Sequence, residues 1–502
     1  MELGRSSGIL LHPTSLPGRF GIGDLGREAH AFVDRLADAG QSWWQVLPLN
    51  PTDASGSPYA SYSAFASNPL LIAIDPLIAR GWLTEDDVAQ LVDFALSEPD
   101  DRVDFSQLAQ LKMQVLRLAF QRHDAQAEVK AYEEKHSDWL EDVALFRSFK
   151  AVDPRSWRDW DPGIVRRDNF ALANAITKAE PGNAQLMAQE LHFTAFAQWL
   201  FEEQWRELKA YANGKGVRLI GDLPIFVAMD SADVWANREW FEVGQDGTAQ
   251  DVAGVPPDYF SATGQKWGNP LYNWPALEAD GFRWWIRRVQ RALDLCDLVR
   301  IDHFRGFESY WAVPEEAPNA IIGEWRNGPG DALFKAIHDA LGAVPFIAED
   351  LGIITDAVVA LRDRNNLPGM KILQFAFDGN PNHPFLPHTY PERCVAYTGT
   401  HDNDTSRGWY ESLPEHEKHR VRSYLRHGDE GIVAAMMESV AASKAELVVF
   451  PLQDVLDLDA DARMNIPGSS TGNWGWRATA AQLNDDAAFQ RLADITHRTD
   501  RT

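Results

Sequence analysis

The feature that most constrains the fold is a series of short apolar runs, each followed by a polar or Pro-containing turn. Such runs are typical of buried β-strands, and amphipathic helical stretches lie between most of them. In one stretch, for example, Phe32, Val33 and Leu36 share a helical face and Gly40 follows its end. The runs are GILLHP (8–13), WWQVLP (43–48), VRLIGDLP (217–224), DLVRIDHF (297–304), PFIAEDLG (345–352), GMKILQF (369–375), CVAYTGTHD (394–402) and ELVVFPLQD (446–454).

Strand and helix in alternation predict an α/β fold with a parallel sheet, and eight repeats favour a closed (β/α)₈ TIM barrel over an open sheet. We therefore predict that residues 1–502 form a single barrel. A minimal barrel takes about 250 residues, so much of the chain must be insertion. We expect a mainly helical insertion subdomain at about 76–200, after the second strand. A second insertion at about 250–275, rich in Pro, Gly and aromatic residues, reads as a loop that forms a lid over the active site.

Charge and cysteine content limit the partners and the compartment. The formal net charge is -26, which disfavours nucleic acid and anionic membranes as partners. Cys296 and Cys394 make neither a disulfide framework nor a metal pattern and read as buried thiols. The N-terminal apolar run, 9–11, is short for a signal peptide, and no stretch approaches the roughly 18 apolar residues of a membrane span. We expect a cytoplasmic protein; the sequence does not indicate its oligomeric state.

Charged side chains collect where the predicted strands end. Active sites of (β/α)₈ barrels form at the C-terminal ends of the strands, so these residues are expected to share one rim. They are Asp222 on the third strand, Arg300 and Asp302 on the fourth, Glu349 and Asp350 on the fifth, and His401 and Asp402 after the seventh.

Three of these acids fit a division of labour between charged and protonated carboxyl groups. Arg300 and Asp302, two apart on a strand, should point the same way, and a guanidinium beside a carboxylate favours its anionic form, as a nucleophile requires. Glu349 follows an apolar run, where desolvation raises a carboxyl pKa toward the range of a general acid. One charged and one protonated carboxyl is the arrangement of retaining glycoside chemistry. Asp402 would be a third acid that binds sugar hydroxyls and helps to distort the ring.

Each acid taken alone is better explained as a salt bridge or a helix cap, and we assign Asp350 to that class. His303 and Arg305 are likewise expected to anchor loops. For Asp302, Glu349 and Asp402 together the structural explanation is weaker, because gathering three acids is unfavourable without a function that uses them.

Several aromatic side chains lie in polar, irregular segments with little core to fill. Flat apolar rings match the faces of sugars, so we expect these side chains to stack on a sugar ligand. They are Tyr59 in GSPYASYSAFASNP (56–69), and Tyr259, Phe260, Trp267 and Tyr272 in the predicted lid.

Two motif matches are misleading. GIGDLG (21–26) fits G-x-G-x-x-G, but no strand runs directly into it and no acid closes the second strand, so we interpret its glycines as turn residues. DNDT (402–405) begins like a calcium loop but lacks the later Gly and Glu. We therefore expect neither metal nor nucleotide, and no cofactor.

At these residues the sequence resembles the 4-alpha-glucanotransferases, or amylomaltases, of glycoside hydrolase family 77. The resemblance implies a barrel with Asp302 as nucleophile, Glu349 as general acid/base and Asp402 as transition-state stabiliser. It also implies that Arg300, Asp222 and His401 position the donor sugar and that Tyr59 and Trp267 line the glucan path. The motifs that carry it are GIGDLG, WWQVLPL, GSPYASYSAFASNP, GDLPIFV, GVPPDYFSATGQKWGNPLYNW, VRIDHFRGF, IAEDLG, PGMKILQFAFD, YTGTHDNDT, RMNIPG and GNWGWR.

The predicted reaction transfers part of an α-1,4-glucan or maltooligosaccharide to the 4-hydroxyl of another sugar, with retention of configuration. Carboxylates alone do not distinguish this from hydrolysis, so an amylase-like hydrolase is the first alternative; a non-catalytic glucan-binding protein is the second. Retention predicts that the Asp302 and Glu349 carboxyl groups lie roughly 5 to 5.5 Å apart.

Overall fold

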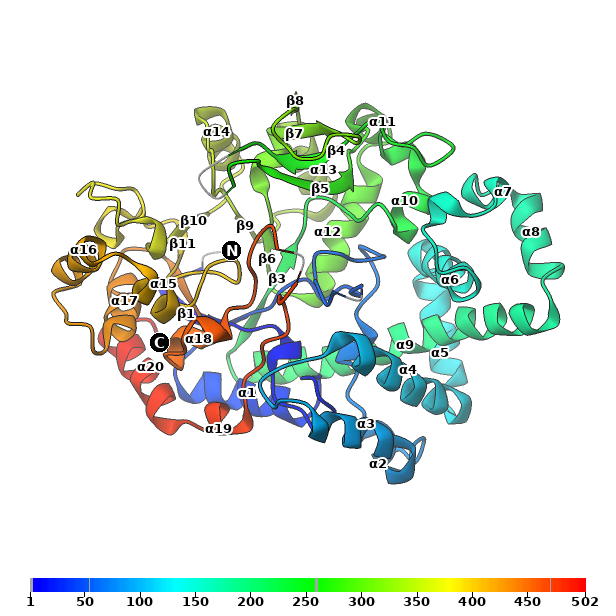
Figure 1. Cartoon of the computed structure of the whole chain (residues 1–502), viewed down its shortest axis with the longest axis horizontal. Coiled ribbons are helices and arrows are strands. Elements are labelled where there is room, and N and C mark those ends of the chain that lie inside the picture. The colour runs from blue at the N-terminus through cyan, green and yellow to red at the C-terminus, as the bar shows by residue number, and fades with distance from the viewer. Residues whose placement is uncertain (1–2, 54, 258–260, 470) are drawn as a thin grey trace.

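The computed structural model describes residues 3–53, 55–257, 261–469 and 471–502. Its centre is a closed barrel of eight parallel strands in the order β1-β12-β11-β10-β9-β6-β3-β2 (Figure 1). All eight predicted strands are present, and the predicted (β/α)₈ fold is confirmed. The strands are β1 (Ser6–Leu10), β2 (Trp43–Gln45), β3 (Arg218–Leu223), β6 (Leu298–Ile301), β9 (Phe346–Ala348), β10 (Gly369–Ile372), β11 (Cys394–Tyr397) and β12 (Leu447–Pro451).

The barrel closes where its first and last strands meet. β1 pairs with β12 from Ser6 opposite Leu447 onward, and with β2 from Gly8 opposite Trp43. A side chain at residue 8 would lie 2.5 Å from the Trp43 carbonyl oxygen, so the close approach of β1 and β2 requires glycine there. The strands are buried almost throughout, as expected for a parallel sheet covered by helices.

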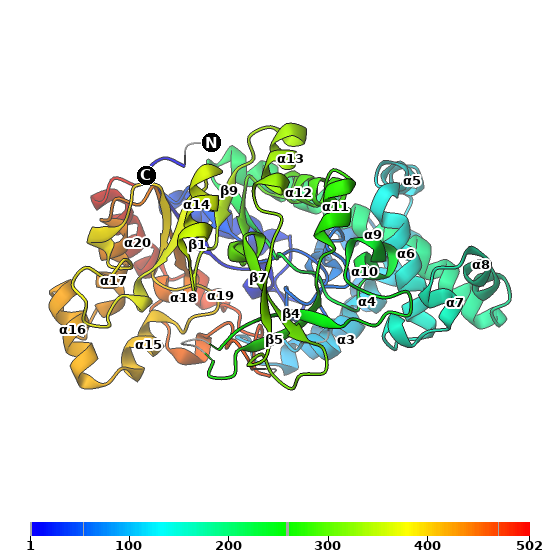
Figure 2. The ribbon, with the colours of Figure 1, turned by 90° about the horizontal axis from the view of Figure 1, so that it is seen from above.

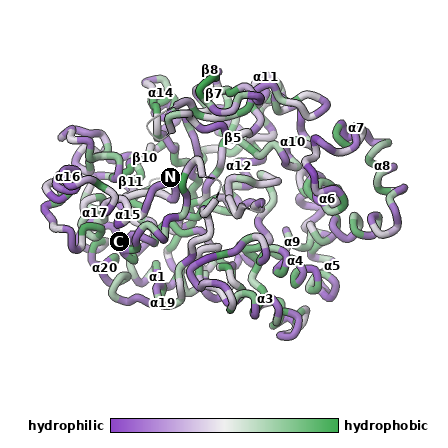
Figure 3. Tube along the Cα trace, in the orientation of Figure 1, coloured by the Kyte–Doolittle hydropathy of each residue, from purple (hydrophilic) through white to green (hydrophobic). Residues whose placement is uncertain are grey.

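Helices on the outside of the barrel cover these strands (Figure 2). Figure 3 shows hydrophilic and hydrophobic residues alternating along many helices, as in a helix with one buried face. In α1, for example, Phe32, Val33 and Leu36 are buried, as predicted. The helices outside the segment between β2 and β3 include α1 (Arg27–Asp38), α12 (Arg283–Leu295), α13 (Asp331–Leu341), α14 (Asp356–Arg364), α15 (Ser406–Ser412), α16 (Glu415–Leu425), α17 (Ile432–Ala441), α18 (Leu452–Val455), α19 (Ala480–Leu483) and α20 (Asp486–Arg498).

The segment between β2 and β3 is helical and extends to one side of the barrel (Figure 1). Its longest helix, α9, packs on α6 within this segment and on α1, α12 and β3 of the barrel. Trp205, in its second half, donates from Nε1 to the Leu295 carbonyl oxygen at 2.8 Å. The helical segment therefore continues beyond 200 into the barrel wall. Its helices are α2 (Asp75–Ala79), α3 (Glu85–Ser97), α4 (Phe105–Arg122), α5 (Gln126–Lys135), α6 (Ser137–Val152), α7 (Pro162–Val165), α8 (Asn169–Thr177) and α9 (Pro181–Gly214).

The segment at about 250–275 is not the irregular loop that we predicted. It contains a β-hairpin, β4 (Asp251–Val255) and β5 (Gln265–Pro270), in a second, antiparallel sheet of order β5-β4-β7-β8. The other two strands of this sheet, β7 (Ser309–Pro314) and β8 (Glu324–Asn327), follow the fourth barrel strand. The residue pattern at 250–275 therefore does not indicate that β4 pairs with β7. The short helices α10 (Ala232–Ala236) and α11 (Trp274–Ala279) flank the hairpin in sequence.

None of the helices in the described ranges is long and apolar enough to cross a bilayer.

Candidate active site

Two of the predicted site acids are attached directly to barrel strands. Asp302 follows β6, and its backbone N–H donates to the Leu223 carbonyl oxygen of β3 at 3.0 Å. Glu349 follows β9, and its N–H donates to the Ile301 carbonyl oxygen of β6 at 3.1 Å. These bonds continue the sheet pairing past the strand ends, so both carboxyl groups extend from backbone that the barrel holds rigidly.

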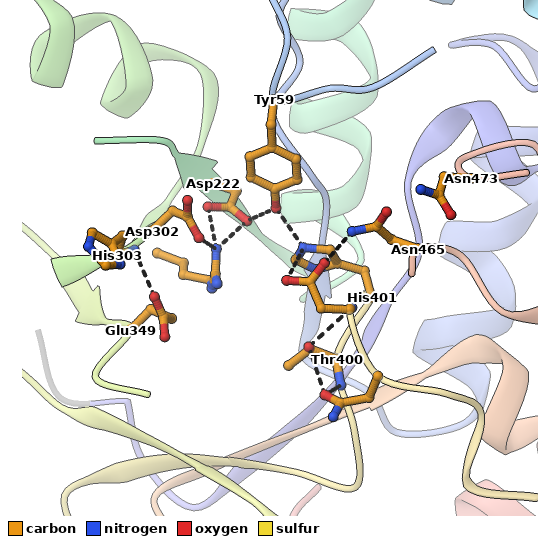
Figure 4. Close-up of polar contacts among 12 residues, drawn as sticks. Tyr59, Asp222, Asp302, His303, Glu349, Thr400, His401, Asn465 and Asn473 are labelled. Atoms are coloured by element: carbon orange, nitrogen blue, oxygen red, sulfur yellow. Dashed lines mark hydrogen bonds and ion pairs between the residues drawn. The ribbon is translucent and has the colours of Figure 1, made fainter. Parts of the chain in front are cut away.

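Asp222, Asp302 and Glu349 lie on one side of the site (Figure 4), and Arg300 contacts the first two of these carboxylates. Its Nη1 lies 2.8 and 2.7 Å from the two carboxylate oxygens of Asp222 and 3.0 Å from Asp302 Oδ1. Burial opposes the charge of Arg300, but Asp222 and Asp302 outweigh it and raise the pKa of the guanidinium well above its ordinary value. Arg300 is thus a fixed cation that orients the Asp302 carboxylate.

Glu349 lies in surroundings that favour its protonated form. Desolvation raises the pKa of its carboxyl group to about 8, Arg300 opposes this, and the negative charge of Asp302 adds to it. Glu349 Oε2 accepts from the His303 backbone N–H at 2.7 Å and Oε1 from that of Leu351 at 3.0 Å. His303 has left-handed backbone with φ of 51°, uncommon outside glycine. This costly conformation directs its N–H at Glu349.

His401 lies across the site from Asp302 and Glu349 (Figure 4). Asp402 follows it on the loop between β11 and α15. The Asp402 carboxylate is 45% exposed, and its Oδ2 lies 3.5 Å from His401 Nε2. Its other oxygen accepts from Asn465 Nδ2 at 2.6 Å, and its carbonyl oxygen accepts from Arg463 at 2.9 Å. Side chains from a distant segment therefore hold this acid in place.

The Tyr59 hydroxyl connects the two sides. It donates to Asp222 Oδ2 at 2.9 Å and lies 2.9 Å from His401 Nε2. Because the single hydroxyl proton goes to Asp222, His401 Nε2 must carry the proton of the second bond and donate it to Tyr59. The Tyr59 ring also stacks on the His401 ring, with centroids 5.4 Å apart, and touches Trp474.

The aromatic side chains that we predicted to stack on sugar differ in their exposure to solvent. Trp267, on β5, is 38% exposed, and its ring meets that of His303 edge-on at 4.9 Å. Tyr272 was predicted to stack on sugar, and this is wrong: its ring is buried against Phe226 in the core, and its hydroxyl donates to the Ile225 carbonyl oxygen. Tyr259 and Phe260 lie outside the described residues.

The residues that we interpreted as structural have local partners. Asp350 accepts from the Met370 backbone N–H and from Arg362. Arg305 donates to the Ile353 carbonyl oxygen and stacks on Trp325. Within the described ranges, no group of three His, Cys, Asp or Glu side chains is placed to hold a metal ion.

Sequence reasoning gave no role to Arg463, Asn465 and Trp474, although they lie in two of the motifs that carry the resemblance. Their contacts with Asp402, His401 and Tyr59 depend on the chain returning to the site after β12. The only available signal was the presence of a polar Asn between apolar residues in RMNIPG.

The chain is similar to characterised proteins over almost its full length. The sequence profile of glycoside hydrolase family 77, described as 4-alpha-glucanotransferase, matches residues 11–483. The chain is 48% identical to the 4-alpha-glucanotransferase of Thermus thermophilus, over 99% of this chain and 100% of that one. It is 49% identical to the Synechocystis sp. 4-alpha-glucanotransferase, over 96% and 95%.

A solved structure agrees with these sequence relationships. The amylomaltase from Streptococcus agalactiae, in complex with acarbose, superimposes with a TM-score of 0.94 at 38% identity, covering 99% of each chain. The chain therefore belongs to the 4-alpha-glucanotransferases of glycoside hydrolase family 77.

Proposed function

We propose that this glucanotransferase moves a segment of an α-1,4-glucan or maltooligosaccharide to the 4-hydroxyl of an acceptor sugar by two displacements at Asp302. The observation that carries the proposal is the contrast between Asp302, ion-paired with Arg300 at 3.0 Å, and Glu349, whose pKa is raised to about 8. One carboxyl is ion-paired with a guanidinium beside one that keeps its proton at neutral pH, an arrangement that suits retaining glycoside chemistry.

In the first step an Asp302 oxygen attacks the anomeric carbon of the donor. The bond from that carbon to the leaving oxygen breaks, and Glu349 gives its proton to that oxygen. The products are a glycosyl ester on Asp302, a shorter glucan with a free 4-hydroxyl, and an ionised Glu349.

The second step needs Glu349 as a base, and the ester itself favours this change. In the free enzyme the negative charge of Asp302 raises the pKa of Glu349, and the positive charge of Arg300 lowers it. Esterification removes the charge of Asp302, while that of Arg300 remains. The pKa of Glu349 therefore falls in the intermediate. Glu349 takes the proton from the acceptor 4-hydroxyl while the oxygen of that hydroxyl attacks the anomeric carbon. Asp302 leaves as a carboxylate. Two inversions restore the α configuration.

We assign the opposite side of the site to binding the donor sugar and stabilising the transition state. The half-exposed Asp402 carboxylate is available to accept hydroxyl hydrogen bonds and to stabilise the positive charge that develops at the anomeric carbon. The linked side chains of Asp222, Tyr59 and His401 restrict the space around that sugar.

We further propose that the hairpin β4–β5 acts as the lid. Trp267 places an exposed aromatic face beside His303, the residue after Asp302, where it can cover an acceptor sugar and exclude water. This arrangement favours transfer over hydrolysis. Two free buried thiols, Cys296 and Cys394, suit a reducing compartment, and we place the enzyme in the cytoplasm.

Incubation with maltotriose tests the reaction. Transfer exchanges one glycosidic bond for another, so we expect glucose and a ladder of longer maltooligosaccharides at a constant concentration of reducing ends. A steady rise in reducing ends, with only glucose and maltose accumulating, would instead establish an amylase-like hydrolase. Binding of maltotriose without any product would establish the non-catalytic alternative.

A further inference from the structure

The loop at 398–406 begins directly after Tyr397, the last residue of β11, and it carries His401 and Asp402 past the end of the strand. A carboxylate on such a loop has no sheet hydrogen bonds to fix its place. The contacts that fix the loop therefore decide where Asp402 stands relative to the bound sugar.

One buried carboxylate, Asp454 of α18, joins the two ends of this loop. Its Oδ2 accepts from the Thr398 hydroxyl at 2.5 Å and from the Ser406 hydroxyl at 2.7 Å. Its Oδ1 accepts from the Ser406 backbone N–H at 2.8 Å. Asp454 is 2% exposed and touches neither His401 nor Asp402 through a hydrogen bond that the structure records.

A carboxyl group is an expensive choice for this position. Burial raises the pKa of Asp454, and the donors from Thr398 and Ser406 oppose that rise. Among the described residues no Lys, Arg or His forms an ion pair with it within 4.0 Å. A buried acid without a cation is tolerated only when donors satisfy its oxygens. Three convergent hydrogen bonds from the loop ends meet that condition.

Other contacts hold different parts of the same loop. Gln374, after β10, donates from its backbone N–H to the Thr398 carbonyl oxygen and from Nε2 to the Asp404 carbonyl oxygen. Arg463 and Asn465 contact Asp402 itself. Asp454 differs from them in binding the side chains of Thr398 and Ser406 together through one buried carboxylate, while remaining outside the site.

We propose that Asp454 is a positioning residue: by tying Thr398 to Ser406 it sets the place of the Asp402 carboxylate for the transition state. The inference rests on the role proposed above for Asp402. A misplacement of about 1 Å of a group that acts on the reacting centre can cost a hundredfold in rate, so the contribution is large enough to measure.

The first test is Asp454→Asn, which keeps the shape but presents an N–H₂ group to one of the loop donors. We expect kcat for maltotriose disproportionation to fall by about 10- to 100-fold, with KM changed by less than about threefold. An unchanged kcat would overturn the proposal.

A double-mutant cycle separates positioning from general destabilisation. If Asp454 acts through Asp402, then Asp454→Asn causes little further loss of kcat in an Asp402→Asn background. The same fold-loss in both backgrounds would overturn the proposal. If Asp402→Asn alone leaves kcat unchanged, it is the proposed role of Asp402 that fails, and the single variant reports this separately.

Two further measurements guard against a folding artefact. Glu190→Gln alters an equally buried carboxyl in the helical insertion, and we expect a lower unfolding temperature with unchanged kcat. If Asp454→Asn fails to fold, Ser406→Ala and Thr398→Val can replace it, because each removes one hydroxyl that donates to Asp454. Each is then combined with Asp402→Asn in the same double-mutant cycle. Additive losses with these variants would likewise overturn the proposal.

Discussion

The two sides of the active site are built in different ways. Asp302 and Glu349 extend from backbone that is hydrogen-bonded to neighbouring barrel strands, at 3.0 and 3.1 Å, and Glu349 is held by two further backbone N–H groups. Asp402 stands on a loop and is held by the side chain of Asn465 and, at its carbonyl oxygen, by Arg463. Backbone contacts keep their geometry through most substitutions, whereas side-chain contacts are lost one at a time.

This difference matches the demands of the proposed chemistry. Bond formation at Asp302 and proton transfer at Glu349 both depend on short, fixed distances to the same sugar, and the barrel supplies them. Stabilisation of charge by Asp402 forms no bond and transfers no proton, so a loop held by side chains can carry it. We therefore expect single substitutions on the Asp302 side to remove activity and those around Asp402 to reduce it in steps.

The largest effect is expected for Asp302→Asn, which removes the nucleophile and keeps its shape. We predict a loss of at least about 10⁴-fold in kcat, comparable to the loss of a nucleophile in other covalent enzymes. Calorimetry should show that maltotriose still binds. Residual kcat within tenfold of the original enzyme would contradict the assignment.

Glu349→Gln is expected to cost about 10²- to 10⁴-fold with maltotriose, the usual contribution of a general acid. The loss in the first step should be much smaller with α-maltosyl fluoride, because fluoride leaves without a proton. Stopped-flow release of fluoride measures this step. Equal losses with both donors would show that Glu349 is not the acid.

Around Asp402 the expected losses are smaller. Asn465→Ala removes a charge-assisted hydrogen bond of 2.6 Å, and we predict a fall of about 10- to 100-fold in kcat/KM. Asn465→Asp tests the same contact with a repulsive partner and should be worse than alanine. If Asn465→Ala leaves kcat/KM unchanged, then the position of the Asp402 carboxylate does not depend on the Asn465 side chain. The contrast between the two sides of the site would then be wrong.

The smallest of the four expected effects is that of pH on kcat/KM. Glu349 must be protonated in the free enzyme, and its pKa is about 8, so kcat/KM should be level from neutral pH up to about that value. Above it, the rate should decline about tenfold for each pH unit, because the ionised fraction of Glu349 cannot protonate the leaving oxygen. A decline that persists unchanged in Glu349→Gln would have another origin.

The barrel was predictable because each strand is a short, local apolar run, and the positions of Asp302 and Glu349 follow from strand ends alone. The hairpin β4–β5 was missed because β4 pairs with β7, a segment far along the chain, and because its glycines and prolines resemble a loop. The close approach of β4 and β5 requires glycine at residue 254, because a side chain there would lie 2.4 Å from the Gln265 carbonyl oxygen. Tyr272 was misassigned because the rings that bury it, those of Phe226, Phe241 and Trp285, come from other parts of the chain.

The surroundings of Asp402 could not be predicted either. Sequence places His401 and Asp402 after the seventh strand, but the contact with Asn465 joins segments that only the closed barrel brings together. The raised pKa of Glu349 was predicted in direction from the apolar run before it. Its backbone donors, the N–H groups of His303 and Leu351, were not, because they depend on loop conformations such as the left-handed backbone of His303.

Trapping the glycosyl-enzyme tests the central claim most directly. In Glu349→Gln, α-maltosyl fluoride can still form the ester but the variant lacks the base for its removal, so the ester should accumulate. We predict that rapid acid quenching, proteolysis and mass spectrometry will find the maltosyl group on the peptide that carries Asp302. A maltosyl group on the Asp402 or Asp222 peptide, or fluoride release with no ester at any time, would contradict it.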